Sequence, residues 1–146
     1  MFRGIHHTSV VVGDMERSIR FYCDLLGLRL ETDKILEGPF ISTVLGYPEC
    51  RARWVTLDAG DDVARIELLQ LLEPRATGAA PPLARVGASH VGLIVDDIQA
   101  DFERLRGQGV RFKSPPQESG GLWAVHFYDP DGISLELIQL PSPAGG

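Results

Sequence analysis

The chain has 146 residues, of which 44% are hydrophobic and 23% are charged, and its formal net charge is −6 at pH 7. This length predicts one ordinary folded domain and excludes a disordered chain, because so apolar a sequence can bury enough surface to offset the entropy of ordering. The acidic excess argues against a protein that binds nucleic acid by neutralising phosphates. The longest apolar runs are far shorter than the roughly 20 residues that a membrane span needs.

The N-terminal residues and the cysteine content favour a cytoplasmic location. The first residues lack the apolar core of a signal peptide, and the only cysteines are Cys23 and Cys50. Two cysteines do not make a disulfide framework of the kind found in small secreted domains. We therefore expect a cytoplasmic protein with reduced cysteines and no membrane attachment.

A strand followed by a helix is predicted at the start of the chain. β-forming residues run from His7 to Val12, and Asp14 is suited to cap the helix that follows. That helix is predicted to end at Gly27, and its apolar stripe is Met15, Ile19, Tyr22 and Leu26. Residues 31–47, which contain two glycines and a proline, predict an excursion that could cover a site as a lid.

The second half of the chain repeats the pattern of the first. Residues 90–97 resemble residues 7–14, and residues 135–140 resemble residues 66–71. Each half therefore predicts a βαβββ module, approximately 4–72 and 88–141, with a Pro-, Gly- and Ala-rich linker at 73–87. Asp97 (or Asp96) is the second helix cap, Val110–Phe112 the expected next strand, and Asp129–Gly132 a strand-connecting turn. A tryptophan stands 13 residues before a glutamate in both halves: Trp54 before Glu67, and Trp123 before Glu136.

Two histidines and two glutamates occupy equivalent places in the modules. His7 and His90 begin the first strands, whereas Glu67 and Glu136 lie inside apolar last strands. Burying a lone ionised carboxylate costs several kcal/mol unless it is paired or binds a metal. Two imidazoles and two carboxylates are together a donor set that suits a borderline divalent ion. The duplication therefore predicts a metal site.

Each residue also has a simpler interpretation. Either histidine could be hydrogen-bonded without a ligand role, and Glu67 could be solvated or paired with Arg65. His6 has the opposite strand orientation to His7. His126, which precedes the turn, is expected to be structural or to support a metal ligand without binding the ion itself. Trp54, Trp123, Phe40 and Tyr47 could line a substrate cup, although core packing is the simpler role for the two tryptophans.

At residues 7–22, 26–28 and 129–137 the chain resembles the vicinal oxygen chelate superfamily, also called the glyoxalase, bleomycin-resistance and dioxygenase superfamily. The most specific elements are Arg17-Ser18-Ile19-Arg20-Phe21-Tyr22 and Asp129-Pro130-Asp131-Gly132. The resemblance implies an α+β fold in which two βαβββ modules form a cupped, eight-stranded mixed sheet around a metal. Residues 1–146 would then be a single glyoxalase-like domain.

The resemblance also implies a chemistry. The metal ligands would be His7, Glu67, His90 and Glu136, the ion would be Ni, Co, Zn, Mn or Fe, and the reaction would pass through an enolate or enediolate. Glu67 or Glu136 would remove the proton, because a carboxylate gains basicity as it leaves the ion in a low-dielectric cup. Glyoxalase I and methylmalonyl-CoA epimerase are the members with both acidic ligands, so a lyase or isomerase acting on a small oxygen-chelating substrate is the expected function.

Departures from those two members leave alternatives open. Val11 stands where glyoxalase I has a glutathione-contacting arginine, and Arg53 and Trp54 stand near the place of the epimerase's second base. An extradiol-type dioxygenase and a metal-independent protein that binds an antibiotic or other small molecule stay as alternatives. Family members are usually dimers, so we expect a homodimer, with or without modules exchanged between chains.

Overall fold

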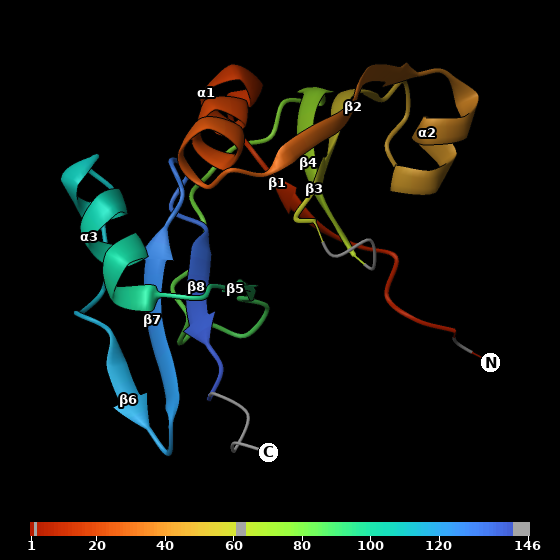
Figure 1. Cartoon of the computed structure of the whole chain (residues 1–146). Helices are drawn as coiled ribbons and strands as arrows, with labels where there is room; N and C mark the ends of the chain where they lie inside the picture. Colours follow the sequence, from red (N-terminus) through yellow and green to blue (C-terminus); the bar gives the residue numbers. More distant parts are fainter. Residues whose placement is uncertain (2, 61–63, 142–146) are drawn as a thin grey trace. The chain divides into compact units, whose positions relative to one another are not determined.

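The computed structural model describes residues 1, 3–60 and 64–141. The chain divides into two compact units, Met1–Gly78 and Ala79–Gly146, and the division falls inside the predicted linker. Each unit holds one four-stranded mixed sheet (Figure 1). The predicted pair of βαβββ modules is confirmed, and each unit is described below by itself.

The first unit is built on a sheet with the strand order β1-β4-β3-β2. β1 runs parallel to β4, and the other neighbours are antiparallel. The helix begins as predicted, since Asp14 Oδ1 accepts the Arg17 N–H at 3.0 Å, and Gly27 follows its end with φ +81°. The elements are β1 (His7–Val11), α1 (Met15–Ile19), the π-helical turn η1 (Arg20–Leu25), β2 (Arg29–Glu37), α2 (Pro39–Leu45), β3 (Arg51–Asp58) and β4 (Arg65–Glu73).

The second unit repeats this arrangement with the strand order β5-β8-β7-β6. β5 is parallel to β8, and Asp97 rather than Asp96 caps the helix by accepting the Ala100 N–H at 3.0 Å. Its elements are β5 (His90–Ile94), α3 (Ile98–Gly107), β6 (Gln117–Ser119), β7 (Leu122–Tyr128) and β8 (Ser134–Gln139). Across the described ranges of both units, no helix combines the length and apolar character that crossing a bilayer requires.

Each sheet buries one face beneath its helix. In the first unit α1 contacts β4, and in the second α3 contacts β8. Because side chains alternate along a strand, burying one face leaves every second residue on the other. The buried residues include Val55, Leu57 and Leu68 in the first unit and Val125, Phe127, Leu135 and Leu137 in the second. The predicted histidines and glutamates lie on the opposite faces.

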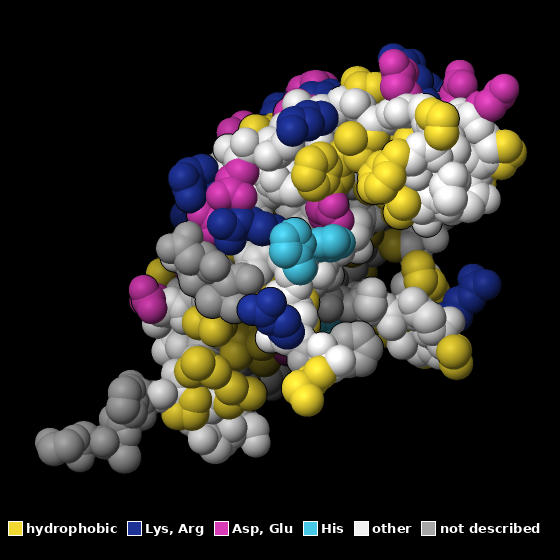
Figure 2. Space-filling view, turned by 90° about the vertical axis from the view of Figure 1, so that its right-hand side faces the viewer, with side chains coloured by type: hydrophobic (Ala, Val, Ile, Leu, Met, Phe, Trp, Pro, Cys, Tyr) yellow, Lys and Arg dark blue, Asp and Glu magenta, His cyan; other side chains and the backbone are white. Residues whose placement is uncertain are grey.

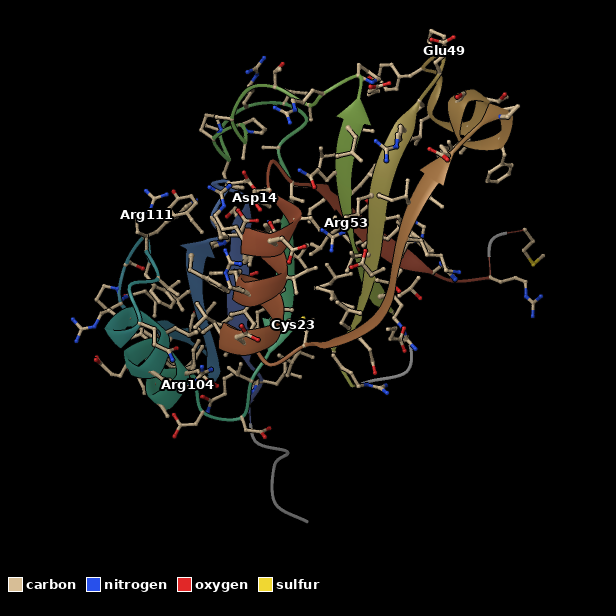
Figure 3. The ribbon with its side chains drawn as sticks, turned by 90° about the horizontal axis from the view of Figure 1, so that it is seen from above. Asp14, Cys23, Glu49, Arg53, Arg104 and Arg111 are labelled. Carbon is tan, nitrogen blue, oxygen red and sulfur yellow. The ribbon has the colours of Figure 1, made fainter. Side chains whose placement is uncertain are left out.

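One arginine ties three elements of the first unit together. Arg53 Nη2 lies 2.6 Å from Asp33 Oδ2 of β2, and Arg53 Nη1 lies 2.6 Å from Glu16 Oε1 of α1. Figure 3 labels Arg53. The hydrogen bonds from Arg53 hold the pKa of Asp33 below its ordinary value. In the second unit Trp123 takes the place of Arg53, since Arg53 pairs with Gln70 and Trp123 with Gln139.

Two expectations about strands need correction. Residues 31–37 do not leave the sheet: they continue β2 and pair with β3 as far as Glu37, and only α2 leaves after Gly38. In the second unit Phe112 makes an isolated bridge to Phe127, and β6 begins only at Gln117. Pro115 and Pro116 separate the two, because proline lacks the N–H that a strand ladder needs.

Candidate metal centre

Strand register brings the first predicted pair together. In the parallel β1–β4 ladder Ser9 is the partner of Glu67, and His7 lies two residues before Ser9 on the same face. His7 Nε2 consequently lies 2.8 Å from Glu67 Oε2. The Glu67 side chain is only 14% exposed, so water solvates this carboxylate poorly. Neighbouring strands of one sheet therefore fix the pair, without a contribution from a loop.

Glu67 has an indole and an imidazole beside it, and no Lys or Arg partner among the described residues. Trp54 of β3 donates its indole N–H to Glu67 Oε1. Among the described ion pairs, Arg65 binds Glu31 at 2.6 Å and Asp58 at 3.6 Å, and no Lys or Arg pairs with Glu67. The simpler interpretation of Glu67, an ion pair with Arg65, is thus not what the structure has. This mostly buried carboxylate has an imidazole and an indole beside it, and lacks the permanent positive charge of a Lys or Arg partner.

A pocket of about 330 Å³ opens beside this pair. Its histidines touch each other, with His6 Nδ1 lying 2.9 Å from His7 Nδ1. That contact engages one ring nitrogen of His7 and leaves Nε2 directed at Glu67. Figure 2 shows that histidine side chains reach the molecular surface beside acidic and apolar ones. The pocket is lined by His6, His7, Glu31, Trp54, Thr56, Arg65 and Glu67.

The second unit reproduces the pair in the same register. Gly92 of β5 is the partner of Glu136 in β8, as Ser9 is of Glu67. His90 Nε2 lies 3.2 Å from Glu136 Oε2, and the Glu136 side chain is 17% exposed. The structure therefore groups the four predicted residues as His7 with Glu67 and His90 with Glu136.

A third histidine, expected to be structural or to support a ligand, stands beside the second pair. His126 is the antiparallel partner of Glu136, and its Nε2 lies 3.7 Å from Glu136 Oε1. The His126 and His90 ring centroids are 4.8 Å apart. Burial lowers the pKa of His126 below its ordinary value, although the charge of Glu136 acts in the opposite direction. The ring is therefore held in its neutral form, which is the form that binds metals.

The equal tryptophan spacing does not reflect structural equivalence. Trp54 is the partner of Leu69, two residues beyond Glu67, whereas Trp123 is the partner of Gln139, three residues beyond Glu136. Because faces alternate with every residue, Trp54 shares the face of Glu67 and Trp123 lies on the opposite face from Glu136. Six residues lie between the end of β3 and the start of β4, and five between β7 and β8, which shifts the register by one residue.

The donor atoms fit a divalent ion of borderline hardness. Each unit offers an imidazole Nε2 and a carboxylate oxygen about 3 Å apart, a spacing compatible with two ligands that each lie about 2 Å from one ion. In the second unit the ligand atoms of His90, His126 and Glu136 all lie within 4.8 Å of one another. The residues present therefore suit Ni, Co, Zn, Mn or Fe(II) better than the oxygen-seeking Mg or Ca.

Comparison with known proteins agrees with the fold. The model of the Glyoxalase/Bleomycin resistance protein/Dioxygenase superfamily matches residues 4–137. A lactoylglutathione lyase of Haemophilus influenzae is 33% identical over 147 residues, covering 97% of this chain and 96% of the relative. A 2-epi-5-epi-valiolone epimerase of an Actinomyces species is 27% identical, covering 96% and 81%.

A solved structure extends the comparison to three dimensions. The chain is similar to a glyoxalase family protein from Bacillus cereus, with a TM-score of 0.88, 23% identity and 97% coverage of both chains. At this identity the likeness shows the shared fold alone.

Proposed function

Because the chain belongs to the glyoxalase, bleomycin resistance protein and dioxygenase superfamily, we propose that it is a metal-dependent lyase or isomerase that moves a proton beside a substrate carbonyl. The observation that carries the proposal is the duplicated His–Glu pair, set in the same parallel register in both units. Relatives named as a lyase and as an epimerase support this class of reaction. The substrate would be a small molecule with neighbouring oxygen atoms.

Four residues would hold the ion: His7, Glu67, His90 and Glu136. When bound, a divalent ion polarises a carbonyl and stabilises negative charge that develops on its oxygen, which lowers the barrier to proton removal by several kcal/mol. The histidines contribute neutral nitrogen donors. In the first unit the contact between His6 and His7 holds the His7 ring with Nε2 toward Glu67.

The carboxylates are the candidates for the base. Glu67 and Glu136 are mostly buried and each lies beside an imidazole, so little water competes with a substrate for them. The Trp54 N–H fixes one oxygen of Glu67, so the other oxygen is the one directed at His7. In the pocket beside this pair, Trp54 provides an apolar wall, whereas Glu31 and Arg65 provide charged groups for polar parts of a substrate.

Solvent-proton exchange tests the proposal whether or not a reaction product has been identified. The full chain is stripped with a chelator, reloaded separately with Co, Ni, Zn, Mn and Fe(II), and incubated in D₂O with lactoylglutathione or with dihydroxyacetone. We expect deuterium to enter the carbon beside the carbonyl of one probe only in metal-loaded protein, as measured by proton NMR. Glu67→Gln and Glu136→Gln should each slow exchange by about 100-fold or more.

The control is Glu73→Gln, which changes an exposed carboxylate at the end of the same strand as Glu67. It should exchange at the wild-type rate. Exchange that survives chelation would contradict metal dependence, and oxygen uptake with a catechol would favour the dioxygenase alternative. Tight probe binding without exchange, indifferent to the chelator, would favour a binding protein.

A further inference from the structure

The third histidine of the second unit distinguishes it from the first. His126 occupies the place opposite Glu136 that Thr56 occupies opposite Glu67. Thr56 offers no nitrogen donor, and in the first unit the second carboxylate oxygen accepts the Trp54 N–H instead. In the second unit that oxygen, Glu136 Oε1, faces the Nε2 atom of His126.

The distance between His126 Nε2 and Glu136 Oε1 suits two neighbouring ligands of one ion and is too long for a hydrogen bond. A separation of 3.7 Å between His126 Nε2 and Glu136 Oε1 exceeds normal hydrogen-bond length. Two donors that each lie about 2.1 Å from one ion are about 3 to 4 Å apart. His90 Nε2 meets the same condition, at 3.2 Å from Glu136 Oε2. The two oxygens of Glu136 thus each face one imidazole.

The surroundings of His126 match those of a metal ligand. Metal-binding histidines engage their second ring nitrogen with a fixed partner, which sets the ring orientation. The Nδ1 atom of His126 lies 3.2 Å from the Oγ of Ser134, a buried residue of the adjacent strand. With Nδ1 so engaged, Nε2 is the nitrogen directed at Glu136.

Gly92 packs closely against Ile138, next to Glu136. A Cβ atom at this position would lie 3.0 Å from Ile138 Cδ1 and 3.7 Å from Glu136 Oε2. Gly92 has an ordinary strand conformation, so backbone freedom does not explain the glycine. A glycine inside a strand often marks close approach of another group.

We propose that His126 is a third metal donor, so that His90, His126 and Glu136 hold a divalent cation without donors from the first unit. The proposal rests on the proposed function in sharing His90 and Glu136 as ligands. It differs in requiring that a cation stay bound when His7 and Glu67 cannot contribute. Two imidazoles and one carboxylate leave coordination positions for water or substrate on a six-coordinate ion.

The test measures Co²⁺ binding to the full-length chain by calorimetry and by the Co²⁺ absorption spectrum. In the double variant His7→Ala/Glu67→Gln we expect about one equivalent of Co²⁺ to stay bound, with weakened affinity. Adding His126→Asn should weaken the residual binding by at least about tenfold, since even indirect partners of ligands contribute 10–100-fold. Asparagine keeps an amide near Ser134 but has no atom at Nε2.

A second substitution at His126 and a control variant show whether a loss of Co²⁺ binding is specific to this histidine. His126→Thr copies Thr56 of the first unit and should weaken binding as His126→Asn does. Glu103→Gln changes an exposed carboxylate on α3 of the same unit and should leave residual binding unchanged. Complete loss of Co²⁺ binding in the double variant would overturn this proposal. It would still agree with the proposed four-ligand site, because that site needs His7 and Glu67. Residual binding that is indifferent to both His126 variants would overturn it as well.

Discussion

The two units share a strand frame but differ in what surrounds each carboxylate. Ser9 and Gly92 stand in the same register position, opposite Glu67 and Glu136 respectively. Glu67 is held by an indole N–H, whereas Glu136 faces a second imidazole. The two units thus place their His and Glu side chains at equivalent positions. The antiparallel neighbour, β3 in the first unit and β7 in the second, supplies a different contact to each glutamate.

This difference shows that position and environment are separate requirements for a site. A parallel pair of strands is enough to bring His7 to Glu67 and His90 to Glu136, at 2.8 and 3.2 Å between ligand atoms. The residue opposite each glutamate on the antiparallel strand makes the difference. Thr56 leaves a His–Glu pair in the first unit, and His126 completes a cluster of three in the second. We therefore expect core substitutions in the two units to lower the free energy of unfolding by similar amounts. We expect the two units to differ in how they bind metal.

The largest expected effect is on the free energy of unfolding, and it tests the packing that the two sheets have in common. Leu68 and Leu137 each follow a proposed ligand carboxylate, point to the opposite face, and are buried. Leu68→Ala and Leu137→Ala should each lower the free energy of unfolding by about 2–5 kcal/mol, because each leaves a cavity in a packed core. Urea unfolding followed by circular dichroism measures both.

The control for these variants is Val86→Ala, a fully exposed residue of the linker, which should stay within about 0.5 kcal/mol of wild type. A loss confined to one of the two leucines would show that the units do not contribute equally to the fold.

A smaller effect is expected from the indole that only the first unit directs at its carboxylate. Trp54→Phe keeps an aromatic ring but removes the N–H donated to Glu67. We expect metal affinity to fall about tenfold, since hydrogen bonds that orient a ligand contribute 10–100-fold. Trp123→Phe, on the face opposite Glu136, should leave affinity unchanged. Equal effects of the two substitutions in a Co²⁺ titration would refute the role given to Trp54.

The smallest effect concerns the Arg53 bridge, for which the second unit has Trp123. The pKa of Asp33 is lowered by its hydrogen bonds from Arg53, so this carboxylate stabilises the fold above its unfolded pKa of about 3.9. That contribution is lost as pH falls through the lowered value. Asp33→Asn should destabilise by less than about 1 kcal/mol at pH 7, because the pair is partly exposed.

A double-mutant cycle with Arg53→Gln isolates the coupling between the two side chains. Measured by urea unfolding at pH 7 and again at pH 3, the coupling should shrink at the lower pH. A coupling that is larger in acid would contradict the assigned direction.

Much of this arrangement follows from sequence because it depends on local rules. Asp14 and Asp97 cap helices, and the repeated His and Glu positions fall on one face of each sheet because strand side chains alternate. His126 is harder to place, since its role depends on the register across the β7–β8 turn. That turn is readable at Asp129–Gly132, and pairing Tyr128 with Ser134 sets His126 opposite Glu136.

The misassigned features depend on pairing between strands distant in sequence. The equal spacing of Trp54 and Trp123 suggests equivalence, but loops of unequal length place them on different faces. Likewise, residues 31–37 stay in the sheet because β3 pairs with Thr32 to Glu37, after a register shift at Glu31. Neither the faces of the two tryptophans nor this strand pairing can be predicted from a short stretch of sequence.

Metal content is the most direct test of the central claim, that the His–Glu pairs bind a divalent ion. Tag-free protein is reconstituted separately with Co, Ni, Zn, Mn and Fe(II), freed of excess metal by gel filtration, and analysed by mass spectrometry of the elements. We predict about one equivalent per chain for at least one metal, and its loss in the double variant Glu67→Gln/Glu136→Gln. The control Glu37→Gln/Glu73→Gln, which changes two exposed strand-end carboxylates, should retain it. Wild-type protein that retains none of the five metals would contradict the account.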